Sequence, residues 1–153
     1  MTREEMTAAE KRIRLFIYRF VLQHDRCPGL NEIAREAELT PLETEGLLRR
    51  LETVHEAIVL SPGSPNLWLA DPFAALPTAY PVFAGRHSWF GMCVWDALAI
   101  LAVAELDGHA PTVCPVSGQQ LVLEVTGGQL TRAEGVAHFA VPATEWWRDI
   151  GFT

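Results

Sequence analysis

The sequence has no apolar run long enough to cross a bilayer. Its longest uninterrupted apolar stretch, residues 97–104, has eight residues, whereas a membrane-spanning helix needs about 20. The first residues, Met-Thr-Arg-Glu-Glu-Met-Thr, also lack the apolar core of a signal peptide. We therefore expect no membrane association and a cytoplasmic protein.

Cysteine is scarce, and no Cys-x-x-Cys pair occurs. The three cysteines, Cys27, Cys93 and Cys114, are an odd number spread over distant segments, which indicates free thiols and argues against a structural zinc site. The histidines show no metal-ligand spacing, and neither a glycine-rich phosphate loop nor a serine-hydrolase motif is present. We predict no resident cofactor.

An excess of basic residues is missing as well. The formal net charge is −7, with 9 Lys and Arg against 12 Asp and Glu in residues 1–78, and 3 against 7 in residues 79–153. Phosphate neutralisation by Lys and Arg supplies most non-specific affinity for nucleic acids. We therefore do not expect nucleic acid as the main partner.

The N-terminal half has the pattern of three helices and a β-hairpin. Residues 7–24 carry apolar side chains at helical spacing, Asn31 is placed to cap a short helix through Leu39, and Thr40 with Glu43 forms a capping box for a helix through about Val54. Two short β-like segments follow, residues 57–60 and 66–70, joined by Ser-Pro-Gly-Ser-Pro. This order predicts a winged-helix-like module over residues 1–78.

Two functions of this module stay open: a packing or dimerisation unit, and a DNA-binding unit. The candidate recognition helix carries Glu43, Glu45 and Glu52 beside its two arginines, and acidic side chains repel phosphates. The composition favours the packing role.

The C-terminal half predicts a helix and a sheet. Residues 72–81 read as a Pro- and Ala-rich linker, and residues 91–106 as a helix that is apolar nearly all round and therefore buried. From Ala110 onward, β-branched segments alternate with turns, the last segment being residues 136–141. We predict an α+β fold, in which the winged-helix-like module precedes a domain, residues 79–153, with a small antiparallel sheet packed on a buried helix.

Cys93 and Asp96 are the candidate functional pair. They lie one turn apart near the start of the apolar helix, so they share one face. The helix N-terminus favours a thiolate at Cys93, and desolvation favours a protonated Asp96. This pairs a nucleophile or soft-metal ligand with a proton donor, and Trp89 and Trp95 flank it as walls of an apolar pocket. The alternative is a buried small hydrophobe at Cys93 and a capping carboxylate at Asp96.

The segments around this pair resemble the organomercurial (alkylmercury) lyases. The resemblance runs through Gly-Met-Cys-Val-Trp-Asp-Ala-Leu at residues 91–98, Cys-Pro-Val-Ser-Gly at residues 114–118, His-Phe-Ala-Val-Pro at residues 138–142, and Trp-Trp-Arg-Asp-Ile-Gly-Phe-Thr at residues 146–153. It implies protonolysis of a carbon–mercury bond, with Cys93 and Asp96 as catalytic residues and mercury ligands and Asp96 as the proton donor. The implied partner is a small organomercurial or similar apolar ligand, with mercury ion as product.

The resemblance also implies a second catalytic cysteine after the segment that ends at Thr153, and the sequence stops there. Cys114 would match a structural cysteine of the family, and whether Cys114 or Cys27 replaces the second thiol stays open. Three functions therefore remain: an active or impaired lyase, a mercury- or ligand-binding sensor or winged-helix regulator without turnover, and a degenerate homologue with another substrate. The sequence predicts no oligomeric state.

Overall fold

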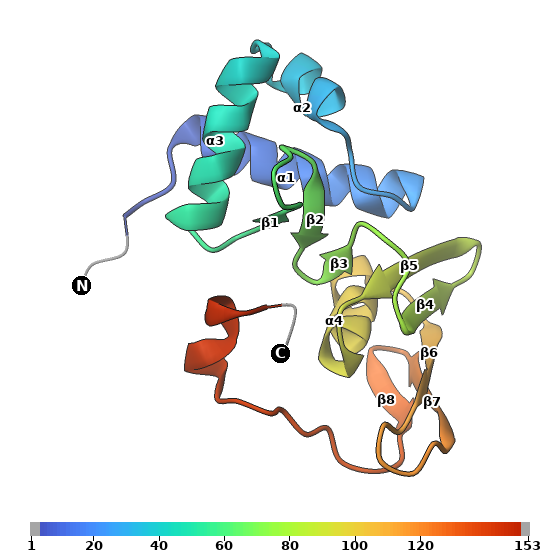
Figure 1. Ribbon diagram of the computed structural model, residues 1–153. Coiled ribbons are helices and arrows are strands. Elements are labelled where there is room, and N and C mark those ends of the chain that lie inside the picture. Colours follow the sequence, from blue (N-terminus) through green and yellow to red (C-terminus); the bar gives the residue numbers. More distant parts are fainter. Residues whose placement is uncertain (1–3, 151–153) are drawn as a thin grey trace. The chain divides into compact units, whose positions relative to one another are not determined.

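The computed structural model describes residues 4–150 and divides into two compact units, Met1–Ala75 and Leu76–Thr153 (Figure 1). The chain order is helices first, then antiparallel sheets with one further helix, which confirms the predicted α+β class. Among the described residues, no helix is both long enough and apolar enough to span a membrane. That residues 1–78 and 79–153 are separate domains stays a prediction.

The first unit begins with three helices, α1 (Ala8–His24), α2 (Leu30–Ala37) and α3 (Pro41–Thr53). The predicted capping box at α3 is present: the Thr40 N–H donates to Glu43 at 2.8 Å, and the Glu43 N–H donates to the Thr40 hydroxyl at 3.3 Å. The predicted cap at Asn31 is wrong. Helix α2 begins one residue after Gly29, because the Glu32 carboxylate turns back to accept the Gly29 N–H at 2.9 Å.

A three-stranded antiparallel sheet completes the first unit: β1 (Val59–Leu60), β2 (Leu67–Ala70) and β3 (Phe73–Ala74), in that order. Strand β3 lies in the segment predicted as a linker, and that prediction is wrong at its start, because Phe73 is only 1% exposed and belongs to the core. Residues from all three helices fill this core: Ile13, Ile17, Ile33, Leu48 and Leu51. The winged-helix interpretation stays a prediction.

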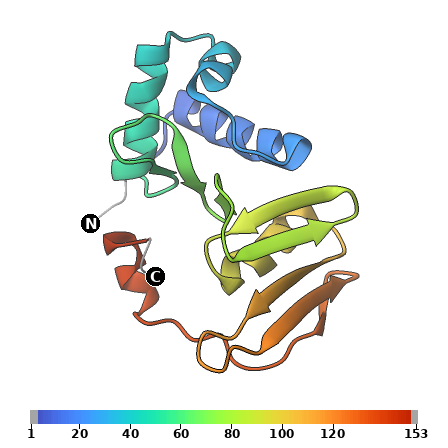
Figure 2. The ribbon, with the colours of Figure 1, turned by 45° about the vertical axis from the view of Figure 1, so that its right-hand side comes forward.

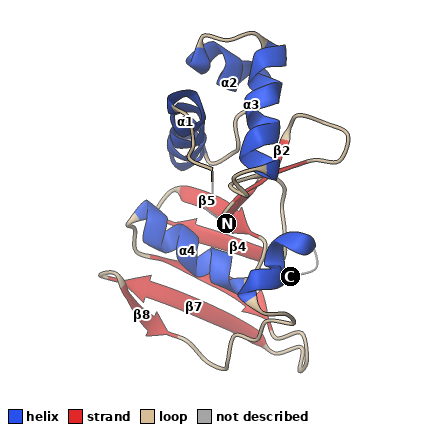
Figure 3. Cartoon of the chain, turned by 90° about the vertical axis from the view of Figure 1, so that its left-hand side faces the viewer, coloured by secondary structure: helices blue, strands red, loops and turns tan. Residues whose placement is uncertain are grey.

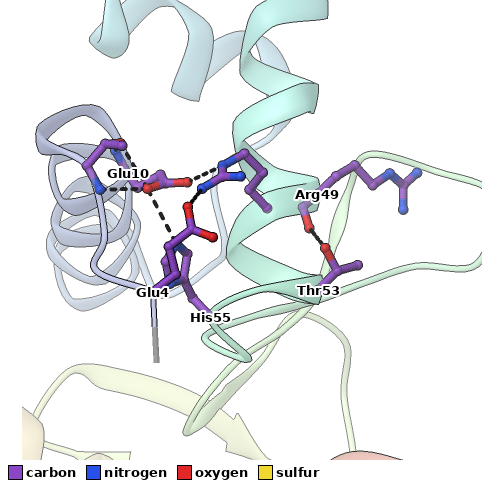
Figure 4. Close-up of polar contacts among 7 residues, drawn as sticks. Glu4, Glu10, Arg49, Thr53 and His55 are labelled. Atoms are coloured by element: carbon purple, nitrogen blue, oxygen red, sulfur yellow. Dashed lines mark hydrogen bonds and ion pairs between the residues drawn. The ribbon is translucent and has the colours of Figure 1, made fainter. Parts of the chain in front are cut away.

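A buried carboxylate ties α1 to α3. Glu10 is 0% exposed, accepts the Thr7 N–H at 2.7 Å and the Arg50 Nε–H at 2.8 Å, and lies 3.3 Å from His55 Nε2 (Figure 4). Arg50 also reaches Glu4 at 2.7 Å. Burial alone raises the pKa of Glu10, but the hydrogen bonds from Thr7 and the hydrogen bond and charge of Arg50 lower it to about 2. Glu10 is therefore held as a carboxylate inside this unit.

The second unit is a five-stranded antiparallel sheet with one α-helix. The strands are β4 (Tyr80–Ala84), β5 (His87–Gly91), β6 (Gly108–Val113), β7 (Gln120–Thr126) and β8 (Gln129–Arg132), ordered β5-β4-β6-β7-β8. Helix α4 (Val94–Ala104) crosses one face of this sheet (Figure 3). A short 3-10 helix, η1 (Ala143–Arg148), follows the last strand.

Three sequence predictions for this unit are wrong. The β4–β5 hairpin (Figure 2) occupies the end of the predicted linker and the residues after it. The segment 136–141 is not a strand. The predicted helix over residues 91–106 is shorter, and it is not buried all round: Ala97, Ile100 and Leu101 are buried, whereas Trp95 is 56% exposed. The reason is that α4 contacts the sheet with only one of its sides.

Candidate active site

The junction between β5 and α4 carries the two predicted functional residues. Strand β5 ends at Gly91, and Cys93 is the N-cap of α4, with an extended backbone at φ −144° and ψ 179°. Asp96 lies in the first helical turn. Cys93 thus precedes the helix instead of lying inside its first turn as predicted, although its carbonyl accepts the Ala97 N–H at 3.1 Å and closes that turn.

Asp96 is a buried carboxylate with a defined structural contact. The residue is 9% exposed, and its Oδ2 accepts the backbone N–H of Met92 at 2.9 Å. This hydrogen bond fixes the segment immediately before Cys93. The capping role that was the alternative interpretation of Asp96 is therefore present. It is compatible with a chemical role, because the carboxyl group has a second oxygen.

The Cys93 thiol is coupled to Asp96 through charge and hydrogen bonding. Burial is the largest effect and raises the pKa of Cys93, and the charge and side-chain hydrogen bond of Asp96 raise it further. The backbone N–H groups of Asp96 and Trp95 act in the opposite direction, but the net pKa is raised. The prediction that the helix N-terminus makes Cys93 a thiolate is therefore wrong, because a half-buried thiol beside a carboxylate is favoured in its protonated form.

Gly91 lets the first turn of α4 approach β5. A Cβ atom added to Gly91 would lie 2.8 Å from the Ala97 nitrogen and 2.8 Å from the Asp96 Cβ, closer than real Cβ atoms approach. We expect Gly91→Ala to lower the free energy of unfolding by about 1–3 kcal/mol, since the helix must shift.

Urea unfolding followed by circular dichroism measures this effect. The matched control is Gly46→Ala in α3, where a Cβ atom meets nothing within 4 Å. Because alanine is a better helix former, this variant is expected to gain about 0.5–1 kcal/mol. Equal stability of Gly91→Ala and the parent protein would show that the close approach has no energetic consequence.

All three cysteines are free, as predicted, but their environments differ. Burial raises the pKa of Cys27 to about 11. Cys114 lies in the turn between β6 and β7, where its carbonyl accepts the Gly118 N–H at 2.9 Å. The Ser117 hydroxyl, followed by the backbone N–H groups of Ser117 and Val116, lowers the pKa of the Cys114 thiol. The most acidic thiol is therefore Cys114, which sequence reasoning did not identify.

These environments predict an order of thiol reactivity at pH 8. Iodoacetamide should alkylate Cys114 first and Cys93 more slowly, because alkylation requires the thiolate. Cys27 should react last, since about one thiol in a thousand is ionised three units below a pKa of about 11. Peptide mass spectrometry over a time course measures the three rates. Fastest labelling of Cys93 would instead support the thiolate expected from the helix N-terminus.

The two tryptophans predicted to wall the site have different positions. Trp89 is 3% exposed and stacks on His87 with ring centroids 5.4 Å apart, so it belongs to the core. Trp95 is exposed, and its ring meets the edge of Phe139 at 6.3 Å. Phe139 in turn lies 4.8 Å from Trp146. The sequence placed Phe139 in a segment that carries the family resemblance, but nothing in its spacing predicted its contact with α4.

Metal-binding side chains do not gather into a larger group. Within residues 4–150, no set of three or more His, Cys, Asp and Glu side chains is placed to hold a metal ion. What the site offers is one thiol and one carboxyl group at the start of a helix. Such a pair can bind a soft metal through sulfur and can transfer a proton through the carboxyl group.

Comparisons with known proteins give a family and a fold. A family model described as alkylmercury lyase (MerB) matches residues 73–153. The fold resembles a crystal structure of the mercury-bound form of MerB2, with a TM-score of 0.66 and 12% sequence identity. The match covers 84% of this chain and 61% of that one, so the chain spans less than two thirds of that structure's length. No curated protein matches significantly.

Proposed function

The chain belongs to the alkylmercury lyase family, and we propose on this basis that it cleaves the carbon–mercury bond of a small organomercurial. The observation that carries the proposal is the coupling of the Cys93 thiol to the buried Asp96 carboxyl group at the start of α4. Both residues lie in the part of the chain that the family model matches.

In the first proposed step, the thiol of Cys93 captures the substrate R–Hg–X. The sulfur–mercury bond forms, X⁻ leaves, and the thiol proton passes to the Asp96 carboxylate, which already interacts with that thiol. Thiolate is a soft ligand suited to mercury. Because the pKa of Cys93 is raised, its thiol keeps the proton until mercury binds. Capture of mercury therefore protonates Asp96.

In the second step, Asp96 returns this proton to carbon. The carbon–mercury bond breaks, its electron pair takes the proton to give R–H, and Asp96 becomes a carboxylate again beside sulfur-bound Hg(II). A thiol from solution binds the mercury as a thiolate and releases its proton to water. A second thiol then displaces the mercury as a dithiolate, and its proton restores the Cys93 thiol. Because Asp96 is buried and held by the Met92 N–H, it is a positioned proton donor, as general acid catalysis requires.

The second candidate function is mercury binding without turnover. It is favoured by the single thiol at the site, because mercury held by Cys93 depends on solution thiols for release. A binding protein of this kind would take up one equivalent of organomercurial and retain the carbon–mercury bond. The two functions differ in whether the hydrocarbon R–H is released.

Release of benzene from phenylmercuric acetate in excess thiol, measured by gas chromatography, separates the two functions. The proposed lyase releases benzene continuously, at a rate proportional to protein concentration and above that of thiol alone. Stoichiometric binding of phenylmercury without benzene would support the binding protein. If neither occurs, both functions are wrong.

A further inference from the structure

An aromatic cluster extends from the start of α4 into the C-terminal segment. We call these three residues, Trp95, Phe139 and Trp146, the aromatic cluster. Trp95 follows Cys93 by two residues, and its backbone N–H forms a hydrogen bond with the Cys93 sulfur. The Phe139 ring meets Trp95 edge-on, at an interplanar angle of 76°, and lies tilted at 36° to Trp146.

The cluster is accessible and borders an open surface hollow. Trp95 is 56% exposed, which is unusual for a tryptophan whose ring already has an aromatic neighbour. This hollow of about 470 Å³ is lined by residues 137–143 and Trp146, so Phe139 and Trp146 form part of its wall. Cavities that bind small molecules have about 300–1,000 Å³ and mostly apolar walls.

The indole N–H of Trp146 already has a hydrogen-bond acceptor within the protein. The Trp146 Nε1–H donates to the Val141 carbonyl at 3.1 Å, which fixes the indole and leaves its carbon surface for contact. Among the residues lining this hollow, His138 contributes the one titratable side chain. The surface therefore suits an apolar ring and offers little to a charged or strongly polar ligand.

We propose that the aromatic cluster is the subsite for the organic group of the substrate, and that it makes the protein select aryl over methyl mercurials. This inference rests on the proposed function, because it assigns the group R of R–Hg–X. A phenyl ring contacts both Phe139 and Trp146, whereas a methyl group is too small to contact either. Each ring contact of this kind corresponds to a preference of about 3- to 10-fold.

Two ratios between phenylmercury and methylmercury test the subsite. The first is the ratio of dissociation constants, measured by competition with glutathione, and the second is the ratio of kcat/KM. For the parent protein, both ratios are expected to favour phenylmercury over methylmercury, and the ratio of dissociation constants should do so more strongly than glutathione does. Phe139→Leu and Trp146→Leu should each reduce the ratios about 3- to 10-fold, while the values for methylmercury stay unchanged and show that the site is intact.

The control variant is Phe83→Leu, because Phe83 is a partly exposed aromatic residue on β4 that stacks on His109 instead of the cluster. It should leave both ratios unchanged. Parent-like ratios in both Phe139→Leu and Trp146→Leu would overturn the subsite. If carbon–mercury cleavage is absent, the proposed function fails, but the ratio of dissociation constants still decides the inference, since binding requires no bond cleavage.

Discussion

Replacing Cys93 with serine is expected to lower kcat/KM for benzene release from phenylmercuric acetate by about 10³-fold or more, as losses of covalent nucleophiles do. A serine hydroxyl occupies nearly the same volume at the N-cap of α4 and is itself a good capping group. The variant should therefore fold like the parent. What it lacks is the soft sulfur ligand, so it should lose both capture of phenylmercury and turnover.

Asp96→Asn separates proton transfer from capture. The asparagine side chain retains an oxygen that can accept the Met92 N–H, so the start of α4 is preserved. It cannot donate the proton that the mechanism requires, and general acid catalysis contributes about 10²- to 10⁴-fold. We expect phenylmercury binding close to that of the parent, because the thiol proton displaced on capture can pass to solvent from the half-buried Cys93. Benzene release should be reduced by that factor.

The matched control for both variants is Cys114→Ser. Cys114 lies in the β6–β7 turn, and the proposed steps assign it no role, so parent-like turnover is expected. Thiol titration counts bound phenylmercury, and gas chromatography counts benzene. If Asp96→Asn turns over at the parent rate, Asp96 is a capping residue and the proton has another source.

The second large effect concerns stability: Glu10→Gln is expected to lower the free energy of unfolding by about 2 kcal/mol at pH 7. Glu10 is fully buried and bonded to Thr7 and Arg50. Glutamine keeps the size of the side chain but replaces the charged oxygen that accepts from Arg50. The network would then lose its charge-assisted hydrogen bonds, which are the strong ones.

The pH dependence of this effect has a definite sign. The pKa of Glu10 is lowered from 4.5 to about 2 in the folded protein, so its contribution is complete above about pH 4.5 and is lost as the pH falls toward 2. Urea unfolding of the two proteins between pH 7 and pH 2.5 should therefore show a difference that shrinks at low pH.

Glu45→Gln is the control for Glu10→Gln, since Glu45 is partly exposed and lies 3.5 Å from Arg49 on the surface of α3. A pair of this kind contributes about 0–1 kcal/mol. Equal unfolding free energies of Glu10→Gln and the parent protein at pH 7 would contradict the role assigned to the buried network.

Local sequence signals predicted the helical half of the fold well. The Thr40–Glu43 capping box and the apolar spacing of α1 act within a few residues, so they can be read from the sequence. The β4–β5 hairpin could not be read in this way. Pro81, which cannot donate a ladder hydrogen bond, lies inside β4 opposite Phe90, and only the sheet that forms around it makes this segment a strand.

The proximity of Cys93 and Asp96 was predictable from the sequence, but the protonation state of the Cys93 thiol was not. The spacing of Cys93 and Asp96 places them at one helix start, and the structure brings them together there. The state of the thiol depends on its burial and on the neighbouring carboxylate, and neither follows from a local pattern. The contact of Phe139 with Trp95 was not predictable for a similar reason, because it joins segments far apart in the chain.

We propose that Cys93 and Asp96 together break a carbon–mercury bond catalytically. The most direct measurement is the number of benzene molecules released per protein molecule from phenylmercuric acetate in excess thiol, compared with Cys93→Ser and Asp96→Asn. We expect many turnovers for the parent protein and at most the background rate of thiol alone for Cys93→Ser. One equivalent of bound phenylmercury with no benzene above background, or equal release by the parent protein and Cys93→Ser, would contradict it.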